Sequence, residues 1–296
     1  MSATAAAPGW RWAPAWVVAF VALWPAPGVA EAVLALGAIA AVLHLLLSRF
    51  RGSAALLTGP AWALTSVLFF AYWLPEAISA IDAADRARAL REALVDLRYL
   101  PFLWLVASAV TGAEGRRRTF GGLAVIVAAW TLDALLQAAT GSSLLFAAID
   151  GLKQAISGHG MCTAAEVAAL DRLSGVLGPC NLKLGIVLAS LSPFALDAAG
   201  RRYGRIGWAL AAVLVGLAVL LAGSRAAWLS YCLVLAWTGW RLLGIKRLLA
   251  VFALGIALLL ASALVSPPVA ERINRSTAVF VGVKQQDPVT GRKPDR

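Results

Sequence analysis

The chain has 296 residues, of which 61% are hydrophobic and 14% are charged, and its formal net charge is +11. Together with a mean hydropathy of +0.80, these values exclude an ordinary soluble globular domain. They also argue against a nucleic-acid partner, because the basic residues fall in short clusters between apolar runs rather than in one basic domain or arm. The composition therefore predicts a polytopic membrane protein.

The apolar runs predict an all-α transmembrane bundle. Each run is continuously apolar and approaches the roughly 17–25 residues of a spanning helix, whereas a strand of a β-barrel would alternate apolar and polar residues. About nine spans are expected, at 12–24, 30–47, 54–74, 99–110, 120–139, 184–199, 206–222, 226–240 and 248–265. The bundle then occupies 1–266, and 267–296 is expected to begin a periplasmic loop.

Two segments between the runs are too polar to span a membrane. Pro75 is expected to end the third run, and 76–97 then carries charges and apolar residues at mostly helical intervals. That pattern predicts a helix lying at the membrane interface. A long polar loop is expected over 141–182.

The basic clusters set the orientation of the bundle. They follow the second, fourth, sixth and eighth runs, always in short loops. Short basic loops favour the cytoplasmic side of a membrane. The N-terminus is therefore expected in the cytoplasm, and 76–97, 141–182 and Arg225 on the outer face.

Arg225 lies in a Gly-Ser-Arg sequence between the seventh and eighth runs, so two spans must reverse there almost at once. A guanidinium held at that point offers a rigid fork of donors that fits a phosphate or diphosphate. The alternative is an arginine that reaches lipid headgroups and only sets the depth of the helices. The residue types leave both interpretations open.

Other polar residues lie at or inside the runs. Arg98 and Lys183 each stand at the mouth of a span on the outer side. Asp133 lies within the fifth run, with Gln137 one turn later on the same face. A carboxylate in a membrane helix is costly unless it is paired or hydrated. Asp133 is therefore expected to face the interior and to pair with an outer arginine, to contact substrate, or to couple proton movement.

The cysteines and histidines point to no metal or cofactor site. Neither CxxC nor any Cys/His ligand spacing is present. Cys162 and Cys180 share the outer loop, which faces an oxidising compartment, so a disulfide is expected between them, whereas Cys232 is expected to be buried in a helix. His159, in the same loop, is a candidate base, although a flexible loop histidine without a catalytic role is the commoner case.

Three segments carry a resemblance to a known family. The segment 223–228, GSRAAW, resembles a signature of the O-antigen ligase and polymerase superfamily. The segment 133–137, followed by Gly141, is similar to a "DallQ…G" segment of the ligases. The segments 172–178 and 182–185 resemble the family's "RlsG" stretch and the start of the next span. All three occur in the family's order.

The resemblance implies a membrane glycosyltransferase of the bacterial inner membrane with a periplasmic active face. Such an enzyme takes a glycan from undecaprenyl diphosphate and joins it, with inversion, to a sugar of the lipid A core, and it needs no metal. Arg225 would stabilise the departing diphosphate. Arg172 would bind phosphate or glycan, or hold the loop. Arg98 and Lys183 are helpers by position rather than by motif.

Several alternatives remain open. An O-antigen polymerase or a protein O-oligosaccharyltransferase shares the expected fold and donor, although the "DallQ" resemblance favours a ligase. A lipid-linked oligosaccharide flippase would show charged residues deep in several helices and internal repeats. The family also carries a second arginine and a catalytic histidine in a later outer loop, followed by about three spans. The given sequence stops inside that loop, so a fragment or a degenerate copy is expected.

Overall fold

A computed structural model describes residues 10–51, 56–163, 166, 173–246 and 249. The chain divides into two compact units, Met1–Thr238 and Gly239–Arg296, and the helical bundle belongs to the first. Within the described residues the regular structure is helical, without strands. The expected all-α class is therefore confirmed for this part of the chain. The ninth expected run, 248–265, and the segment 267–296 lie outside the described residues, apart from Leu249.

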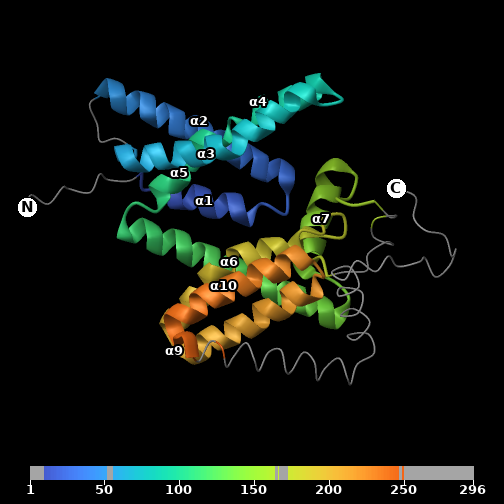
Figure 1. Ribbon diagram of the computed structural model, residues 1–296. Coiled ribbons are helices and arrows are strands. Elements are labelled where there is room, and N and C mark those ends of the chain that lie inside the picture. The colour runs from blue at the N-terminus through green and yellow to red at the C-terminus, as the bar shows by residue number, and fades with distance from the viewer. Residues whose placement is uncertain (1–9, 52–55, 164–165, 167–172, 247–248, 250–296) are drawn as a thin grey trace, which may run out of the picture. The chain divides into compact units, whose positions relative to one another are not determined.

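The described helices follow one another along the chain (Figure 1). They are α1 (Ala13–Ala22), α2 (Pro27–Arg51), α3 (Gly59–Ser79), η1 (Ala80–Asp82), α4 (Arg86–Asp96), α5 (Tyr99–Ala109), α6 (Ala113–Thr140), α7 (Leu144–Ser157), η2 (Gly175–Leu177), α9 (Leu184–Leu221) and α10 (Arg225–Leu243).

Four of the described helices are long and apolar enough to cross a membrane: α2, α3 continued by η1, α6 and α9. The expectation of nine spans is confirmed only to this extent. The first and fourth expected spans form helices of 10 and 11 residues. At 1.5 Å per residue such helices reach only about 15–17 Å, roughly half of a hydrocarbon core of about 30 Å.

Helix α9 contains both the sixth and the seventh expected runs. Its backbone leaves the helical region at Gly204, where φ is +65°, a conformation that suits glycine because it has no Cβ. The two halves, 184–203 and 205–221, run antiparallel. Gly185 near the start of the first half contacts Ala222 just beyond the second, and Gly207 lies against Ala199 across the break. The two runs are thus separate segments of one element.

The segment 76–97 differs from its expected form. Helix α3 continues through Pro75 to Ser79, and a 3-10 turn follows before α4 begins. The side chain of Asp85 caps α4 by accepting a hydrogen bond from the Arg88 amide at 3.1 Å. Most of the charged residues of this segment therefore lie in a separate short helix, α4.

The segment 141–182 is not a continuous loop, because it contains α7 and η2. Ser143 caps the start of α7 by accepting from the Phe146 amide at 3.0 Å. Gly158 follows its end in the left-handed region, with φ of +75°. The apolar residues Ile149, Leu152 and Ile156 recur at helical intervals between these two signals. The polar composition of the flanking residues concealed this pattern.

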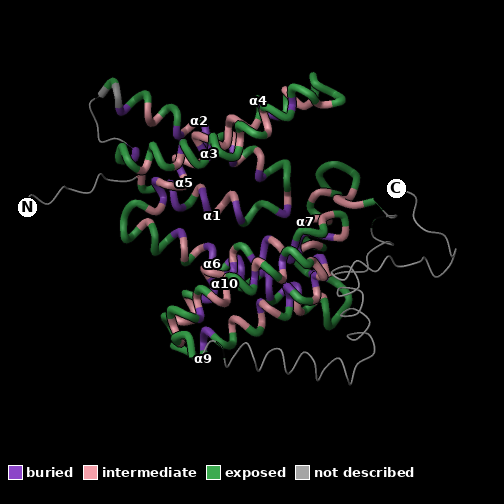
Figure 2. The backbone as a smooth tube through the Cα atoms, in the orientation of Figure 1, coloured by how far each residue is buried: buried purple, intermediate pink, exposed green. Residues whose placement is uncertain are grey.

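The buried residues form two apolar clusters (Figure 2). One cluster joins α6, η2, α9 and α10 and includes Val127, Trp130 and Leu188. The other joins α1, α2 and α5 and includes Leu34 and Leu105. Most remaining large apolar side chains are exposed, as expected for helices that face lipid rather than water.

The two ends of the bundle differ in charge. Arg116, Arg117, Arg201 and Arg202 line one cavity where α6 begins and α9 breaks, and we call this end the arginine end. The rings of Trp10 and His44, 5.9 Å apart, bring the start of α1 beside the last turns of α2.

The opposite end, which we call the loop end, holds Gln137, Lys183 and Arg225. There Gly185 contacts Ser224, and residues of the α1–α2 turn, α7 and the start of α9 line a common cavity. The basic clusters that follow the fourth and sixth expected runs thus meet at the arginine end.

We expect cysteines at positions 117 and 159 to be labelled from opposite sides of the membrane. In a Cys232→Ala background that keeps the Cys162–Cys180 bridge, His159→Cys should react with an impermeant maleimide added outside intact spheroplasts. Arg117→Cys should react only after permeabilisation, since positive residues are retained inside. Labelling of position 117 from outside would contradict this orientation.

Candidate functional site

The loop end brings together all three segments that carry the family resemblance. Gln137 of α6 contacts the stretch before α9: its Oε1 accepts from the Gly175 amide at 2.6 Å, and its Nε2 donates to Ser174 Oγ at 3.3 Å. Ser174 is fully buried. The Gln137 side chain therefore binds the Ser174 hydroxyl and the Gly175 amide, in a turn that begins 37 residues later in the chain.

Glycine is required at the centre of that turn. Gly175 has φ of +52°, and a Cβ built there would lie 2.9 Å from a side-chain carbon of Leu184 and 3.5 Å from Ala134 Cβ. Any larger residue would separate α6 from the start of α9. The Gln137 contact and this close approach together hold the resembling segment 172–178 against the segment 133–137.

Asp133 holds the other side of the same loop. It is 6% exposed, and its two oxygens accept from Ser143 Oγ at 2.6 Å and from the Leu145 amide at 3.0 Å. The expected ion pair with an outer arginine is therefore wrong for the described residues. The N-cap hydroxyl of α7 and one orphan amide of its first turn satisfy the carboxylate without a second buried charge.

The resembling segment 223–228 packs directly on the start of α9. A Cβ at Gly185 would lie 3.1 Å from Ala222 Cβ, 3.2 Å from Ala227 Cβ and 3.7 Å from Ser224 Cβ. The reversal between α9 and α10 depends on Gly223, whose φ is +69°. Trp228 closes the turn by donating from Nε1 to the Val219 carbonyl at 3.2 Å.

Arg225 is the first residue of α10, and its side chain is exposed. Within the described part of the chain it makes no hydrogen bond, ion pair or ring contact. Ser224 immediately before it acts as a weak cap, accepting from the Ala227 amide at 3.4 Å. The guanidinium thus projects from a rigid turn with its donors unused, which is the state required of an anion ligand.

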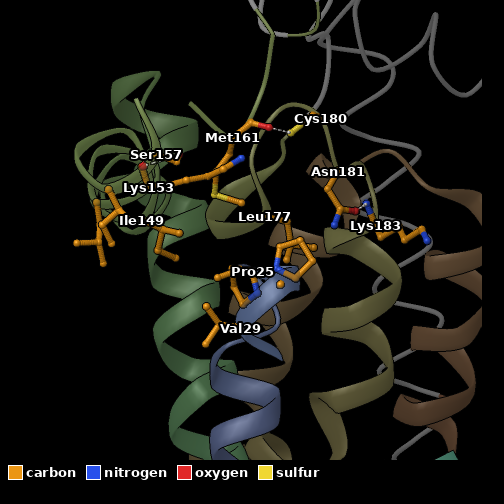
Figure 3. A pocket seen from close by; sticks show the side chains of 15 residues that line it. Pro25, Val29, Ile149, Lys153, Ser157, Met161, Leu177, Cys180, Asn181 and Lys183 are labelled. Atoms are coloured by element: carbon orange, nitrogen blue, oxygen red, sulfur yellow. Dashed lines mark hydrogen bonds between the residues drawn. The ribbon is translucent and has the colours of Figure 1, made fainter. Parts of the chain in front are cut away.

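A cavity of about 810 Å³ lies at the loop end (Figure 3). Apolar residues of the α1–α2 turn and of α7 line most of it, among them Pro25, Val29, Ile149 and Leu152. Its polar lining includes Lys153, Asn181 and Lys183, and none of the lining residues is acidic. An apolar chamber with cationic residues suits an amphiphile that carries negative charge.

The side chains of Lys153 and Lys183 differ in exposure and in hydrogen bonding. Lys153 Nζ donates to the Gly160 carbonyl at 3.2 Å and is half-buried. Lys183 stands immediately before α9 with an exposed side chain, and in Figure 3 it extends away from Ile149 and Val29. Lys183 and Arg225 each lie within two residues of the contact between Gly185 and Ser224. Two cations expected to hold phosphate are therefore brought to one region.

The cysteines expected to form a disulfide, Cys162 and Cys180, are bonded in the structure, with Cα atoms 5.4 Å apart. Cys180 lines the cavity together with Met161 and Leu177, so the bridge holds one side of it. Cys232, expected to be buried, is instead exposed on α10. Its helix position faces the apolar exterior rather than the core.

Removing the bridge should lower the stability of the loop end. A disulfide that closes about 19 residues contributes on the order of 3 kcal/mol to the free energy of unfolding. We expect Cys162→Ser together with Cys180→Ser to lose about that amount in denaturant or thermal unfolding. Cys232→Ser is the matched control and should lose little, since its thiol is exposed. Equal stabilities for the two variants would contradict the structural role of the bridge.

The remaining candidates lie elsewhere or are already engaged. Arg98 forms an ion pair with Glu31 and lies over the Tyr99 ring at 5.4 Å, so its charge is partly neutralised and a direct phosphate contact is not supported. Arg172 lies outside the described residues. His159 is exposed and its Nδ1 contacts the Ser157 carbonyl at 2.8 Å just beyond α7.

Sequence reasoning missed one cation that lines the cavity at this end. Lys153 received no role because α7 was taken for loop, and its place three residues after Asp150 in a capped helix is the signal that could have found it. The described residues contain no group of three or more His, Cys, Asp or Glu that could hold a metal ion.

Comparison with known proteins gives no relative for this chain: no family model, no curated protein and no solved structure matches it. The class of protein that the fold defines is a helical membrane protein.

Proposed function

We propose that this chain is a membrane glycosyltransferase of the O-antigen ligase type. It transfers a glycan from undecaprenyl diphosphate to a sugar of the lipid A core. The observation that carries the proposal is the meeting of the three resembling segments at the loop end. Gln137 binds the Ser174–Gly175 turn, and Gly185 packs on the turn that bears Arg225.

The reaction needs a cation at the leaving group. The bond between the sugar's anomeric carbon and the diphosphate oxygen breaks, and the acceptor hydroxyl oxygen forms the new bond on the opposite face while losing its proton. Negative charge therefore grows on the diphosphate. Arg225, with unused donors, and Lys183, with an exposed ammonium, supply positive charge at this end. The apolar cavity beside Lys183 excludes water from a bound lipid.

The charged residues inside the helices support a transferase over a flippase. A flippase would show charged residues deep in several helices, whereas Asp133 is the only charged side chain buried among the described residues. Its two oxygens accept from Ser143 Oγ and the Leu145 amide. Asp133 therefore positions α7, and the acceptor hydroxyl gives its proton to water.

The location of the site fits the periplasmic face of a bacterial inner membrane. The loop end carries the Cys162–Cys180 disulfide, and disulfides persist in oxidising compartments such as the periplasm. The arginine end lies opposite, where the positive-inside rule places the cytoplasm. The carrier lipid and the lipid A core acceptor are both lipid-anchored, so donor and acceptor approach from the bilayer.

The proposal is tested by product formation. The purified protein in proteoliposomes is given undecaprenyl-diphosphate-linked glycan with lipid A core as acceptor, and glycan joined to the core is measured on gels and by mass spectrometry. A second arm omits the core, so that lengthening of the carrier-linked glycan would identify a polymerase. Transport of the intact carrier-linked glycan without product in either arm would contradict the transferase proposal.

A further inference from the structure

A second cavity, of about 740 Å³, lies at the arginine end. It lies between the first turns of α6 and the part of α9 that precedes the break at Gly204. Arg116, Arg117, Arg201 and Arg202 line it, and so do the aromatic rings of Phe120 and Phe194, whose centroids are 5.1 Å apart. The proposed transferase reaction uses none of these residues.

The carboxylates around this cavity do not balance its charge. Arg201 forms an ion pair with Asp197, and Arg117 is paired with Glu114 at 2.8 Å. Arg116 donates instead to the carbonyls of Val110 and Thr111, both at 3.1 Å.

Arg202 donates to the Tyr203 hydroxyl at 3.0 Å. Two of the four guanidiniums, those of Arg116 and Arg202, thus have no carboxylate partner among the described residues.

The start of α6 adds to the positive field. Its N-cap, Gly112, has no side chain to accept from the first-turn amides, and Ala113 of that turn lines the cavity. Unsatisfied amides at a helix start carry partial positive charge. Glu114 in the same turn offsets part of this charge through its ion pairs with Arg117 and Arg118, and an anion beside Arg116 would offset more of it.

The apolar surroundings distinguish this cavity from an ordinary basic surface. Phe120 and Phe194 are its aromatic part, and Ile206, just beyond the break, is 82% exposed. Both α6 and α9 are long and apolar enough to span a membrane. A ligand here meets cations and hydrocarbon together, as the phosphate and the first acyl carbons of a membrane lipid require.

We propose that the arginine end binds an anionic phospholipid through its headgroup. The phosphodiester lies between Arg116 and Arg202 near the start of α6, and an acyl chain follows the Phe120 and Phe194 rings. The site is separate from the transferase site at the loop end, and it anchors that end of α6 and α9 to the membrane surface. Its existence does not depend on the proposed enzymatic activity.

The test measures lipid binding to the detergent-purified protein by native mass spectrometry. Phosphatidylglycerol should bind, and phosphatidylcholine, which is zwitterionic, should bind at least tenfold more weakly. Arg116→Gln with Arg202→Gln should weaken phosphatidylglycerol binding about thirtyfold, from about 1 kcal/mol for each arginine. The charge-retaining pair Arg116→Lys and Arg202→Lys should lose less, because it keeps the charge and loses the fork.

Arg86→Gln with Arg91→Gln is the matched control, since it removes two exposed arginines of α4 and changes the net charge equally. The control should bind phosphatidylglycerol as the unmodified protein does. An equal loss in the control would show diffuse charge attraction and overturn the proposal. Binding of soluble glycerol phosphate as tight as that of phosphatidylglycerol would also overturn it, because the acyl chain would then contribute nothing.

Discussion

Replacing Arg225 with alanine or lysine is expected to lower the rate of glycan transfer by about a hundred- to thousandfold, by analogy with loss of one donor to a developing anion. The structure gives the reason: the guanidinium projects from a turn fixed by Gly223 and Trp228, and its donors are unused. Lysine keeps the charge but offers a point donor in place of a fork. The same proteoliposome assay measures both variants.

The Arg225 variants need a control for insertion and folding. Arg91→Ala removes another exposed arginine, on α4, and should leave transfer unchanged. Near-normal turnover in Arg225→Lys would contradict bidentate binding. Near-normal turnover in Arg225→Ala would return this residue to the role of setting helix depth.

Asp133→Ala is expected to destabilise the fold by about 3 kcal/mol or more. The carboxylate is buried and accepts two hydrogen bonds, and alanine would leave the Ser143 hydroxyl proton and the Leu145 amide without an acceptor. Asp133→Asn should lose less, since one amide oxygen can still accept. The measurement is thermal or denaturant unfolding in detergent, with proteolysis of α7 as a local readout.

Thr131 provides the matched control for Asp133. It lies on the same helix and is 3% exposed, but its hydroxyl has no hydrogen-bond partner among the described residues. Thr131→Val should therefore change the free energy of unfolding little. If Asp133→Ala were as mild as Thr131→Val, the carboxylate would not be holding α7 in place.

The helices follow from the sequence wherever apolar residues run continuously. The runs at 120–139, 184–199 and 206–222 became α6 and the two halves of α9, because an apolar environment leaves helix formation as the way to satisfy the backbone. The number of spans did not follow, since α1 and α5 are only 10 and 11 residues long. A hydropathy pattern shows where the chain is apolar. It does not show where the backbone hydrogen bonds of a helix end, and these set the helix length.

Helix α7 was expected to be loop because the composition of its segment is polar and glycine-rich. Its cap at Ser143, its terminal Gly158 and its apolar spacing were all present in the sequence. They lay within a stretch whose glycines and polar residues indicate a loop. Local capping signals were the more reliable guide there, because they report hydrogen bonds that the helix makes.

The site could be predicted as separate segments but not as a set of contacts. The three resembling stretches identified Gln137, the turn at Gly175 and Arg225. The bond from Gln137 to Gly175 joins residues 38 apart, and the packing of Gly185 on Ser224 is equally distant in sequence. The contacts of Asp133 did not follow either: its oxygens accept from Ser143 Oγ and the Leu145 amide, and no described arginine forms the ion pair that was one of its expected roles.

Equilibrium binding of the carrier lipid tests the central claim most directly. The protein in nanodiscs is titrated with undecaprenyl diphosphate and, separately, with undecaprenol, which has the same chain without the phosphates. We expect the diphosphate to bind at least a hundredfold more tightly, and Arg225→Lys to remove most of that difference while undecaprenol binding stays the same. Equal affinity for the two lipids, or an unchanged difference in Arg225→Lys, would contradict a diphosphate site at the loop end.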